Sequence, residues 1–111
     1  MTDSAPEIVV EDDPGQHRFE VRMDGALAGF AVYRIDGPTI TFVHTEIDPA
    51  FEGHGLGSKL VRAALDASRA RDLAVRPECP FVRGYIEKHA EYLDLVPEGQ
   101  RAAFGLAEPA P

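Results

Sequence analysis

A glycine-rich turn is the feature of this sequence whose residue types and spacing are best suited to chemistry. The turn reads Glu52-Gly53-His54-Gly55-Leu56-Gly57 and is followed by a helix that is expected to begin with Ser58 and Lys59. Glycines let the main chain approach a ligand closely, and the unpaired amides of a helix start attract anions. The turn therefore predicts a pyrophosphate site. The alternative interpretation is a sharp connection between a strand and a helix that binds nothing.

Two better-known phosphate motifs do not fit this turn. A P-loop needs Lys and then Ser or Thr directly after its last glycine, whereas Gly57 is followed by Ser58 and then Lys59. The dinucleotide fingerprint Gly-x-Gly-x-x-Gly needs a third glycine at the position of Ser58 or of Leu60, depending on where it starts. Neither motif is present.

Two side chains before the turn are candidates for a general base. His44 and Glu46 are two residues apart in a predicted strand, so both point to one face of it. Either group could take a proton from an incoming amine. The alternatives are a surface glutamate for Glu46 and a hydrogen-bonded structural histidine for His44.

The single cysteine is a third candidate. Cys79 precedes Pro80, and proline is favoured at the first position of a helix, which makes Cys79 the expected cap. A helix start stabilises a thiolate, so Cys79 could protonate a leaving thiolate or accept an acyl group transiently. The alternative is a small buried residue at the end of a strand.

Three strands are expected to position the turn from its N-terminal side. Residues 17–23, 27–35 and 39–47 are β-prone, and Asp24-Gly25 and Asp36-Gly37-Pro38 between them are turn signals. The pattern predicts an antiparallel meander. In its third strand, His44 and Glu46 share a face with the apolar residues Ile40 and Phe42, unless a bulge shifts the register.

After the turn the apolar period changes to that of a helix ending near Asp72. Its predicted buried face consists of Leu56, Leu60, Val61, Ala64, Leu65 and Ser68. A short strand over residues 73–75 and a second helix from Pro80 follow. The apolar face of that helix is formed by Phe81, Val82, Tyr85 and Ile86. Residues 1–14 and 97–111 are expected to be loosely held, which leaves one domain over residues 15–96.

The composition of the chain disfavours several classes of partner and site. The 111 residues include 19 acidic and 11 basic ones, and a net charge of −8 disfavours nucleic acid. No run approaches the roughly 20 apolar residues of a membrane span, and the acidic start lacks a basic leader, so we expect a cytoplasmic protein. One cysteine excludes an internal disulfide and a two-cysteine metal knuckle, and no metal is expected.

The motifs resemble the GNAT superfamily of N-acetyltransferases, whose signature Gln/Arg-x-x-Gly-x-Gly/Ala follows a strand ending in Val-x-Pro. The matching stretch here is Ile47-Asp48-Pro49-Ala50-Phe51-Glu52-Gly53-His54-Gly55-Leu56-Gly57, with Glu52 in place of Gln or Arg. Further segments are similar to a compact branch of that superfamily: Val43-His44-Thr45-Glu46, Gly55-Leu56-Gly57-Ser58-Lys59-Leu60-Val61, and Cys79-Pro80-Phe81-Val82 with Tyr85, His89 and Tyr92. The resemblance spans residues 17–95.

This resemblance implies an α+β fold with a mainly antiparallel central sheet flanked by helices. Full-length relatives insert two helices between their first strands, and Asp24-Gly25 leaves no room for them here. The resemblance also implies acetyl-CoA as cofactor, with its pyrophosphate on the amides of the turn and its pantetheine arm along the third strand. The cofactor-binding residues would be Thr45, Ile47, Gly53, His54, Gly55, Leu56, Gly57 and Ser58.

The implied function is transfer of an acetyl group from acetyl-CoA to a primary amine by direct attack within a ternary complex. Tyr85 would be the conventional proton donor to the thiolate, and plain core packing is the alternative for it. A non-catalytic module that binds acyl-CoA as a sensor or scaffold is the rival function. Without the helix pair the acceptor side should be open, to be completed by a second subunit of a homodimer or by an acceptor protein.

Overall fold

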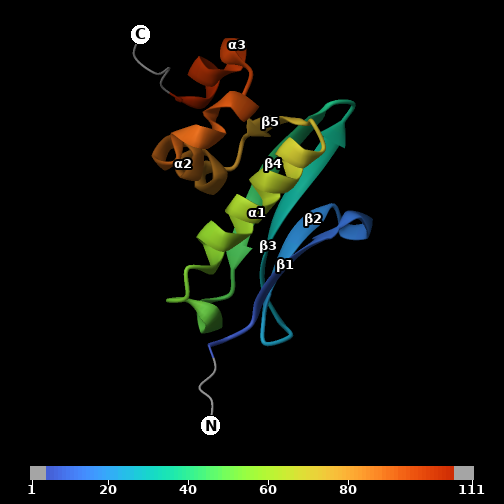
Figure 1. The fold of residues 1–111 in the computed structure, drawn as a ribbon, viewed down its shortest axis with the longest axis vertical. Helices are drawn as coiled ribbons and strands as arrows, with labels where there is room; N and C mark the ends of the chain where they lie inside the picture. Colours follow the sequence, from blue (N-terminus) through green and yellow to red (C-terminus); the bar gives the residue numbers. More distant parts are fainter. Residues whose placement is uncertain (1–4, 107–111) are drawn as a thin grey trace.

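The computed structural model describes residues 5–106, which form one five-stranded sheet with a long helix lying across it (Figure 1). The strands are β1 (Ile8–Asp13), β2 (Arg18–Met23), β3 (Ala26–Asp36), β4 (Thr39–Ile47) and β5 (Ala74–Pro77), and they lie in the sheet in that order. The first four are antiparallel, whereas β5 is parallel to β4. The expected α+β class with a mainly antiparallel sheet is confirmed.

The connections between the first strands are very short. Asp24 and Gly25 have φ values of 51° and 86°, as a two-residue hairpin turn with two left-handed positions requires. Between β1 and β2 the chain forms only the 3-10 turn η1 (Pro14–Gln16). Within the described residues no helix pair separates the first strands, as expected.

A β-bulge changes the two faces of β4. Val32 pairs with His44 but the next residue, Tyr33, pairs with Phe42, so one extra residue of β4, Val43, is inserted between them. Ile40 and Phe42 are buried, while His44 and Glu46 are exposed. Ile40 and Phe42 thus share one face and His44 and Glu46 share the other, because the bulge turns the second pair away from the core. The four residues do not share a single face.

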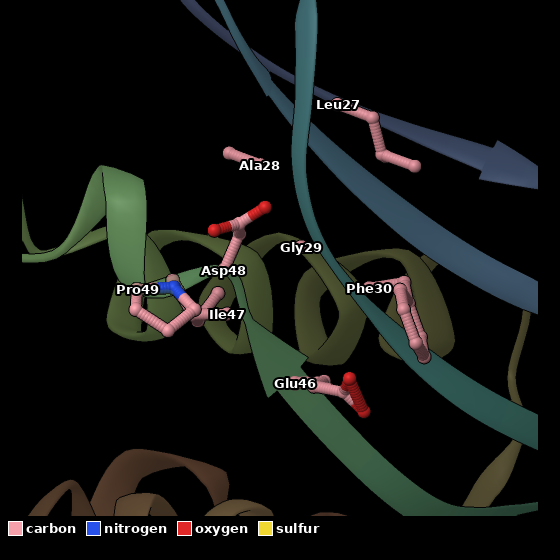
Figure 2. A pocket seen from close by; sticks show the side chains of 8 residues that line it. All are labelled: Leu27, Ala28, Gly29, Phe30, Glu46, Ile47, Asp48 and Pro49. Carbon is pink, nitrogen blue, oxygen red and sulfur yellow. The ribbon is translucent and has the colours of Figure 1, made fainter.

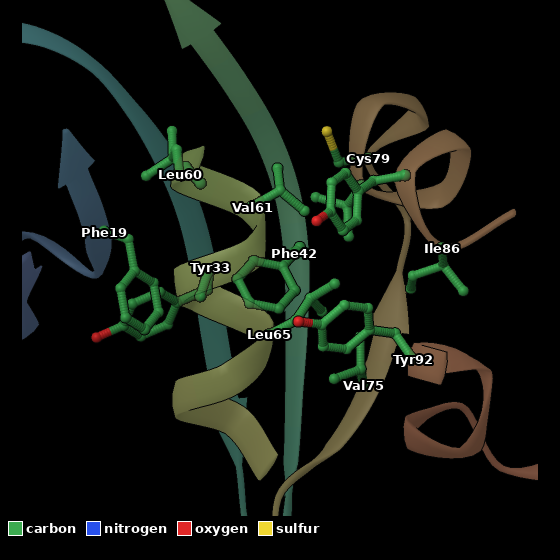
Figure 3. Close-up of a cluster of buried hydrophobic side chains, with 14 of the residues drawn as sticks. Phe19, Tyr33, Phe42, Leu60, Val61, Leu65, Val75, Cys79, Ile86 and Tyr92 are labelled. Carbon is green, nitrogen blue, oxygen red and sulfur yellow. The ribbon is translucent and has the colours of Figure 1, made fainter. Parts of the chain in front are cut away.

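The core lies between the sheet and α1 (Leu56–Ala70), whose crossover joins β4 to β5 (Figure 3). The buried residues of α1 are the predicted ones: Leu56, Leu60, Val61, Ala64, Leu65 and Ser68. The helix ends two residues before the predicted limit, and β5 begins one residue after its predicted start. None of the described helices is long and apolar enough to cross a bilayer.

The second helix, α2 (Pro80–Lys88), begins as predicted, with Cys79 as its N-cap and Pro80 at its first position. Phe81 was expected on its buried face, but this side chain is 45% exposed. The ring lies instead over the start of α1: a Cβ on Gly57 would come within 2.5 Å of the Phe81 Cζ atom. The prediction for Phe81 was therefore wrong.

Both chain ends are better held than expected. All six residues of β1 pair with β2, from Ile8 opposite Met23 to Asp13 opposite Arg18. After α2 the chain forms η3 (Ala90–Leu95), α3 (Glu98–Arg101) and η4 (Ala102–Phe104), and Leu106 joins the core with 4% exposure. The prediction of loose ends was wrong for these segments, because their partners are distant in sequence. Residues 1–4 and 107–111 of that prediction lie outside the described part.

Candidate functional site

The turn between β4 and α1 presents a run of unpaired backbone amides. The 3-10 turn η2 (Pro49–Phe51) is capped by Asp48, whose Oδ1 accepts from the Ala50 amide at 2.9 Å. The chain then takes left-handed conformations at Gly53 (φ 92°) and Gly55 (φ 68°), the N-cap of α1. Among the described residues, the amides of residues 53–58 donate no hydrogen bond, and the next amide, that of Lys59, bonds to the Gly55 carbonyl at 3.2 Å.

These amides border a shallow hollow of about 240 Å³. Its walls are formed by Ile47, Phe51, Glu52, Gly53, Gly55, Leu56, Gly57, Ser58 and Phe81. Unpaired amides at a helix start, together with the helix dipole, attract a phosphate group. The turn therefore meets the requirement set by the sequence prediction: its amides have no internal partner, and no described side chain caps them. A pyrophosphate fits this donor set.

Next to the turn, the outer edge of β4 is left open. Pairing with β5 extends from Thr39 to Phe42 only, and the last backbone hydrogen bond across the gap joins the Cys79 amide to the Phe42 carbonyl at 2.9 Å. The Asp48 amide bonds to Ala28 on the β3 side. Since neighbouring amides of a strand point in opposite directions, those of Thr45 and Ile47 point to the open side. An extended ligand could pair with them as an added strand.

Cys79 lies where β4 and β5 separate. Its side chain is 3% exposed, and its Sγ atom is 3.3 Å from the Thr45 hydroxyl oxygen. As the N-cap of α2 it stands at the positive end of that helix. The structure thus brings together two residues that the sequence prediction assigned to different roles, one to acyl chemistry and one to cofactor binding.

The two candidate bases lie on the other side of β4. His44 Nε2 is 3.0 Å from Glu46 Oε1, and the two side chains are 58% and 59% exposed. Glu46 borders a pocket of about 470 Å³, beside the Phe30 ring on the neighbouring strand (Figure 2). A second carboxylate, that of Asp48, lines the same pocket. Two carboxylates and an aromatic ring in one pocket form an environment suited to a cationic amine.

Tyr85 is separate from both groups. It lines a groove between α1 and α2 with Ser58, and its ring stacks on His89 with centroids 4.0 Å apart. Burial, opposed by the nearby charge of Arg62, raises the pKa of Tyr85, so the hydroxyl keeps its proton at neutral pH. The Tyr92 hydroxyl already donates a hydrogen bond to Asp66 Oδ1 at 2.7 Å, so its proton is not directed at the groove.

Sequence reasoning missed the surroundings of two side chains in the segment after Cys79. Phe81 forms a wall of the hollow rather than part of the core. Arg83 has a buried Nε atom that makes no hydrogen bond within the described part of the chain, although its Nη2 atom lies 3.4 Å from the Glu78 carbonyl oxygen. The helical spacing of Phe81 gave no signal, because it fits core packing equally well.

Comparisons with known proteins concern the family and the fold of the chain. A model of the GCN5-related N-acetyl-transferase family matches residues 18–95. Protein NATD1 of Xenopus tropicalis is 30% identical over 96 residues, covering 83% of this chain and 88% of that protein. Protein NATD1 of Homo sapiens is 31% identical over 91 residues, covering 78% of this chain and 80% of that protein.

One solved structure, a ribosomal-protein-alanine N-acetyltransferase from Brucella melitensis biovar Abortus 2308, matches with a TM-score of 0.51. The match covers 85% of this chain and 66% of that one, at 17% sequence identity. At this identity the likeness concerns the fold alone.

Proposed function

Because the chain belongs to the GCN5-related N-acetyl-transferase family, we propose that it transfers an acetyl group from acetyl-CoA to a primary amine by direct attack in a ternary complex. The observation that carries the proposal is the run of unpaired amides over residues 53–58, which continues into the unpaired edge of β4. A pyrophosphate followed by an extended arm with amide groups matches that sequence of donors and acceptors.

In this proposal the chain holds the cofactor mainly through its backbone. The amides of Gly53, His54, Gly55, Leu56, Gly57 and Ser58 bind the pyrophosphate. The main chain of Thr45 and Ile47 would pair with the pantetheine arm along the open edge of β4. Glu52 adds no favourable charge, so the backbone and the helix dipole supply the binding energy for the phosphates. The cofactor contributes a reactive acyl thioester.

On the acceptor side, Glu46 is the proposed base. Its carboxylate takes the proton of the incoming ammonium so that the nitrogen can form a bond to the acyl carbon. His44 Nε2, at 3.0 Å from Glu46 Oε1, holds that carboxylate in place and is the alternative base. The pocket beside Glu46 and Asp48 favours an acceptor that arrives as a cation, such as a lysine side chain, an N-terminal amine or a polyamine.

On the thiol side, Cys79 is the first candidate to protonate the sulfur that leaves as the carbon–sulfur bond breaks. It lies at the separation of β4 and β5, beside the open edge of β4 that would hold the arm, and Thr45 can hydrogen-bond its Sγ atom. Tyr85 is the second candidate, since its hydroxyl remains protonated at neutral pH. Cys79 lies beside the Thr45 side chain, whereas the Glu46 side chain points to the other face of β4, so acid and base would approach the acyl group from two sides.

The test is release of free thiol from acetyl-CoA, measured with and without an amine acceptor such as spermidine or a lysine peptide. Glu46→Gln should lower acceptor-dependent turnover about 100-fold while leaving acetyl-CoA affinity unchanged. Glu11→Gln is the matched control, because Glu11 is 57% exposed and distant from β4, and it should leave turnover intact. Cys79→Ala and Tyr85→Phe then identify the acid. The residue whose replacement causes the larger loss of turnover, at unchanged acetyl-CoA affinity, is the proton donor.

Three results would count against parts of this proposal. Saturable binding of acetyl-CoA without any acceptor-dependent thiol release would favour the sensor function. Undiminished turnover of Cys79→Ala would remove the thiol from the mechanism. An absence of binding would contradict the assignment of the turn itself.

A further inference from the structure

The hairpin of β3 and β4 extends past the start of β2 at the end of the sheet remote from the glycine turn (Figure 1). The pairing of β2 with β3 ends at Arg18 opposite Val32, and one further hydrogen bond joins the Tyr33 amide to the His17 carbonyl at 2.9 Å. Residues 34–36 pair with β4 only. Within the described chain, the β2-facing side of these three residues, called the β3 edge below, is therefore open.

The β3 edge presents the backbone of Ile35. Neighbouring amides of a strand point in opposite directions, and the Tyr33 amide points toward β2. The amide and carbonyl of Ile35, two residues further on, therefore point to the same side. Among the residues that the structure describes, none pairs with them there. A strand edge with a free donor and a free acceptor is a template for pairing with another strand.

A pocket of about 750 Å³ lies against the β3 edge. Its walls are η1 with His17, residues 32–36 of β3, and Arg71 at the end of α1. Ile35 contributes to the lining and is 37% exposed, although it is a large apolar side chain, and residues 34–38 are all exposed. The open edge thus has space beside it and an apolar side chain available for contact.

The side chains of the β3 edge are complementary to a second copy of themselves. Two such edges that pair antiparallel with Ile35 on the two-fold axis place Arg34 of each copy opposite Asp36 of the other. Both pairs join opposite charges, on one face of the strands. Ile35 meets its own copy through two reciprocal backbone hydrogen bonds, because its amide and carbonyl both point outward.

Both charges of the β3 edge are available for such a contact. Within residues 5–106, Asp36 forms no ion pair. Arg34 is 58% exposed, and its ion pair with Glu78 is long, at 3.8 Å. An exposed pair of this kind contributes little to stability, so Arg34 can exchange it for a carboxylate of a second copy.

The opposite edge of the sheet has a different charge pattern. There β1 contains Glu11, Asp12 and Asp13 in succession and no basic residue. Charges of one sign on an edge strand repel a second copy of the same strand. The β3 edge instead has one charge of each sign around an apolar residue. The pattern therefore favours self-association through the β3 edge and disfavours it through β1.

The same register leaves room for the tip of the second hairpin. Two residues from the axis, Gly37 of one copy comes opposite Tyr33 of the other, beside the walls of the pocket that η1 and His17 form. Gly37 has no side chain, and the ring of Pro38 fixes the backbone that follows it. The pocket can thus accept the compact tip of the partner hairpin.

We propose that the protein forms a two-fold dimer in which the β3 edge pairs antiparallel with the β3 edge of a second copy. The contact is small, so the dissociation constant should be on the order of 100 µM. Ile35 lies roughly 23 Å along β3 from Ala28 in the pocket beside Glu46. The second subunit therefore leaves the acceptor side open and does not complete it. This inference does not rest on the proposed function.

The experiment is sedimentation velocity of the full chain at concentrations from about 10 µM to 1 mM. The wild-type protein should change from monomer to dimer across this range. Arg34→Asp places two carboxylates opposite each other at both charge pairs, and Asp36→Arg places two guanidinium groups there. Each single variant should therefore weaken association by about tenfold or more. Glu11→Arg, a charge reversal on β1, is the control and should associate like the wild type.

Mixing the two single variants gives the sharpest test. Opposite charges then face each other again at both pairs, because one copy is acidic and the other basic at the two positions. The equimolar mixture should associate about as tightly as the wild type. The double variant Arg34→Asp/Asp36→Arg should regain self-association for the same reason. Melting temperatures of the single variants measured alone establish that each one is folded.

Three results would overturn the proposal. The first is a wild-type protein that stays monomeric at about 1 mM. The second is a dimer whose dissociation constant is unchanged in both single variants, because another surface would then hold it together. The third is a loss of association that neither mixing nor the double variant restores, because the substitutions would then act within one chain, for example through Glu78. Binding and turnover of acetyl-CoA test the proposed function separately.

Discussion

The two ends of α1 are built in opposite ways. At its start, the amides of residues 53–58 have no partner in the described chain, and the turn ahead of them contains two glycines in left-handed conformations. At its end, the amides that follow the helix are all paired: those of Arg71, Asp72 and Leu73 bond to carbonyls of the last turn, and that of Ala74 bonds to Pro38. One end is left open and the other is closed.

Side chains follow the same division. Beyond the closed end, the Tyr33 hydroxyl donates to Asp12 Oδ1 at 2.6 Å, and Arg71 approaches the other oxygen of Asp12 at 3.4 Å. Arg69 forms a bidentate salt bridge with Asp94, with N–O distances of 2.8 and 3.0 Å. At the open end, Lys59 and Arg62 have no such partners within the described residues. The contrast indicates that the closed end contributes to stability, while in our proposal the open end gives up stability to bind a ligand.

The largest expected effect comes from two glycines that share one backbone conformation. Gly55 has φ 68° and ψ 26°, and Gly105 has φ 70° and ψ 22°, and a Cβ at either would meet no atom within 4 Å. Changing either to alanine should cost about 1–2 kcal/mol of unfolding free energy, because both positions are left-handed. Only Gly55→Ala should weaken acetyl-CoA binding, by at least about tenfold, since its methyl group enters the hollow at the turn.

Denaturant unfolding and calorimetric titration of the two variants provide the measurement. Because the folding cost is matched, stability cannot explain a difference in binding. Equal acetyl-CoA affinity of Gly55→Ala and Gly105→Ala would show that the open end of α1 is not the ligand site.

The next effect concerns the closed end. Tyr33→Phe removes the hydroxyl that holds Asp12 and should cost about 1–2 kcal/mol of unfolding free energy, because a partly buried hydrogen bond is lost and the carboxylate loses a partner. Acetyl-CoA affinity should not change. A variant that keeps full stability, or one that binds the ligand less well, would contradict the division between the two ends of the helix.

A smaller effect should appear at alkaline pH. Burial, the hydrogen bond to Asp12 and the charge of that carboxylate raise the pKa of Tyr33 to about 12, against an ordinary value of about 10. Between these values the unfolded chain loses the proton that the folded chain keeps, so the unfolding free energy should fall as the pH rises from about 10 to 12. Below pH 10 the contribution is fully present.

Two other tyrosines also have a raised pKa: burial raises that of Tyr85, and the hydrogen bond to Asp66 raises that of Tyr92. The informative quantity is therefore the difference between the wild type and Tyr33→Phe. A decline of equal steepness in the two proteins would remove Tyr33 from this account.

Much of the frame could be predicted from local patterns. The strand over residues 39–47 has the expected bounds, and α1 buries the six residues that its period of 3.6 selects. Asp24-Gly25 forms the expected turn, because only a few residue types accept two left-handed positions in succession. The unpaired amides of the turn followed from the glycines and from the helix start. Each of these features depends on neighbours in the sequence.

The features that could not be predicted depend on distant partners. The strand β1 has no clear alternation and contains Glu11, Asp12 and Asp13, so nothing local shows that β2 will pair with it. The bulge at Val43 reverses the faces of β4 without a glycine to mark it. Phe81 occupies a regular helical position, yet its ring lies over Gly57 because that residue has no side chain to exclude it.

The most direct test of the central claim is an NMR titration of the amide-labelled protein with acetyl-CoA. We expect saturable shifts for the amides of residues 53–58 and none for those of Arg71, Asp72, Leu73 and Ala74, because only the first group is free to donate to a phosphate. Acetyl-CoA that leaves the amides of the turn unchanged, or that shifts those at the closed end of α1 instead, would contradict it.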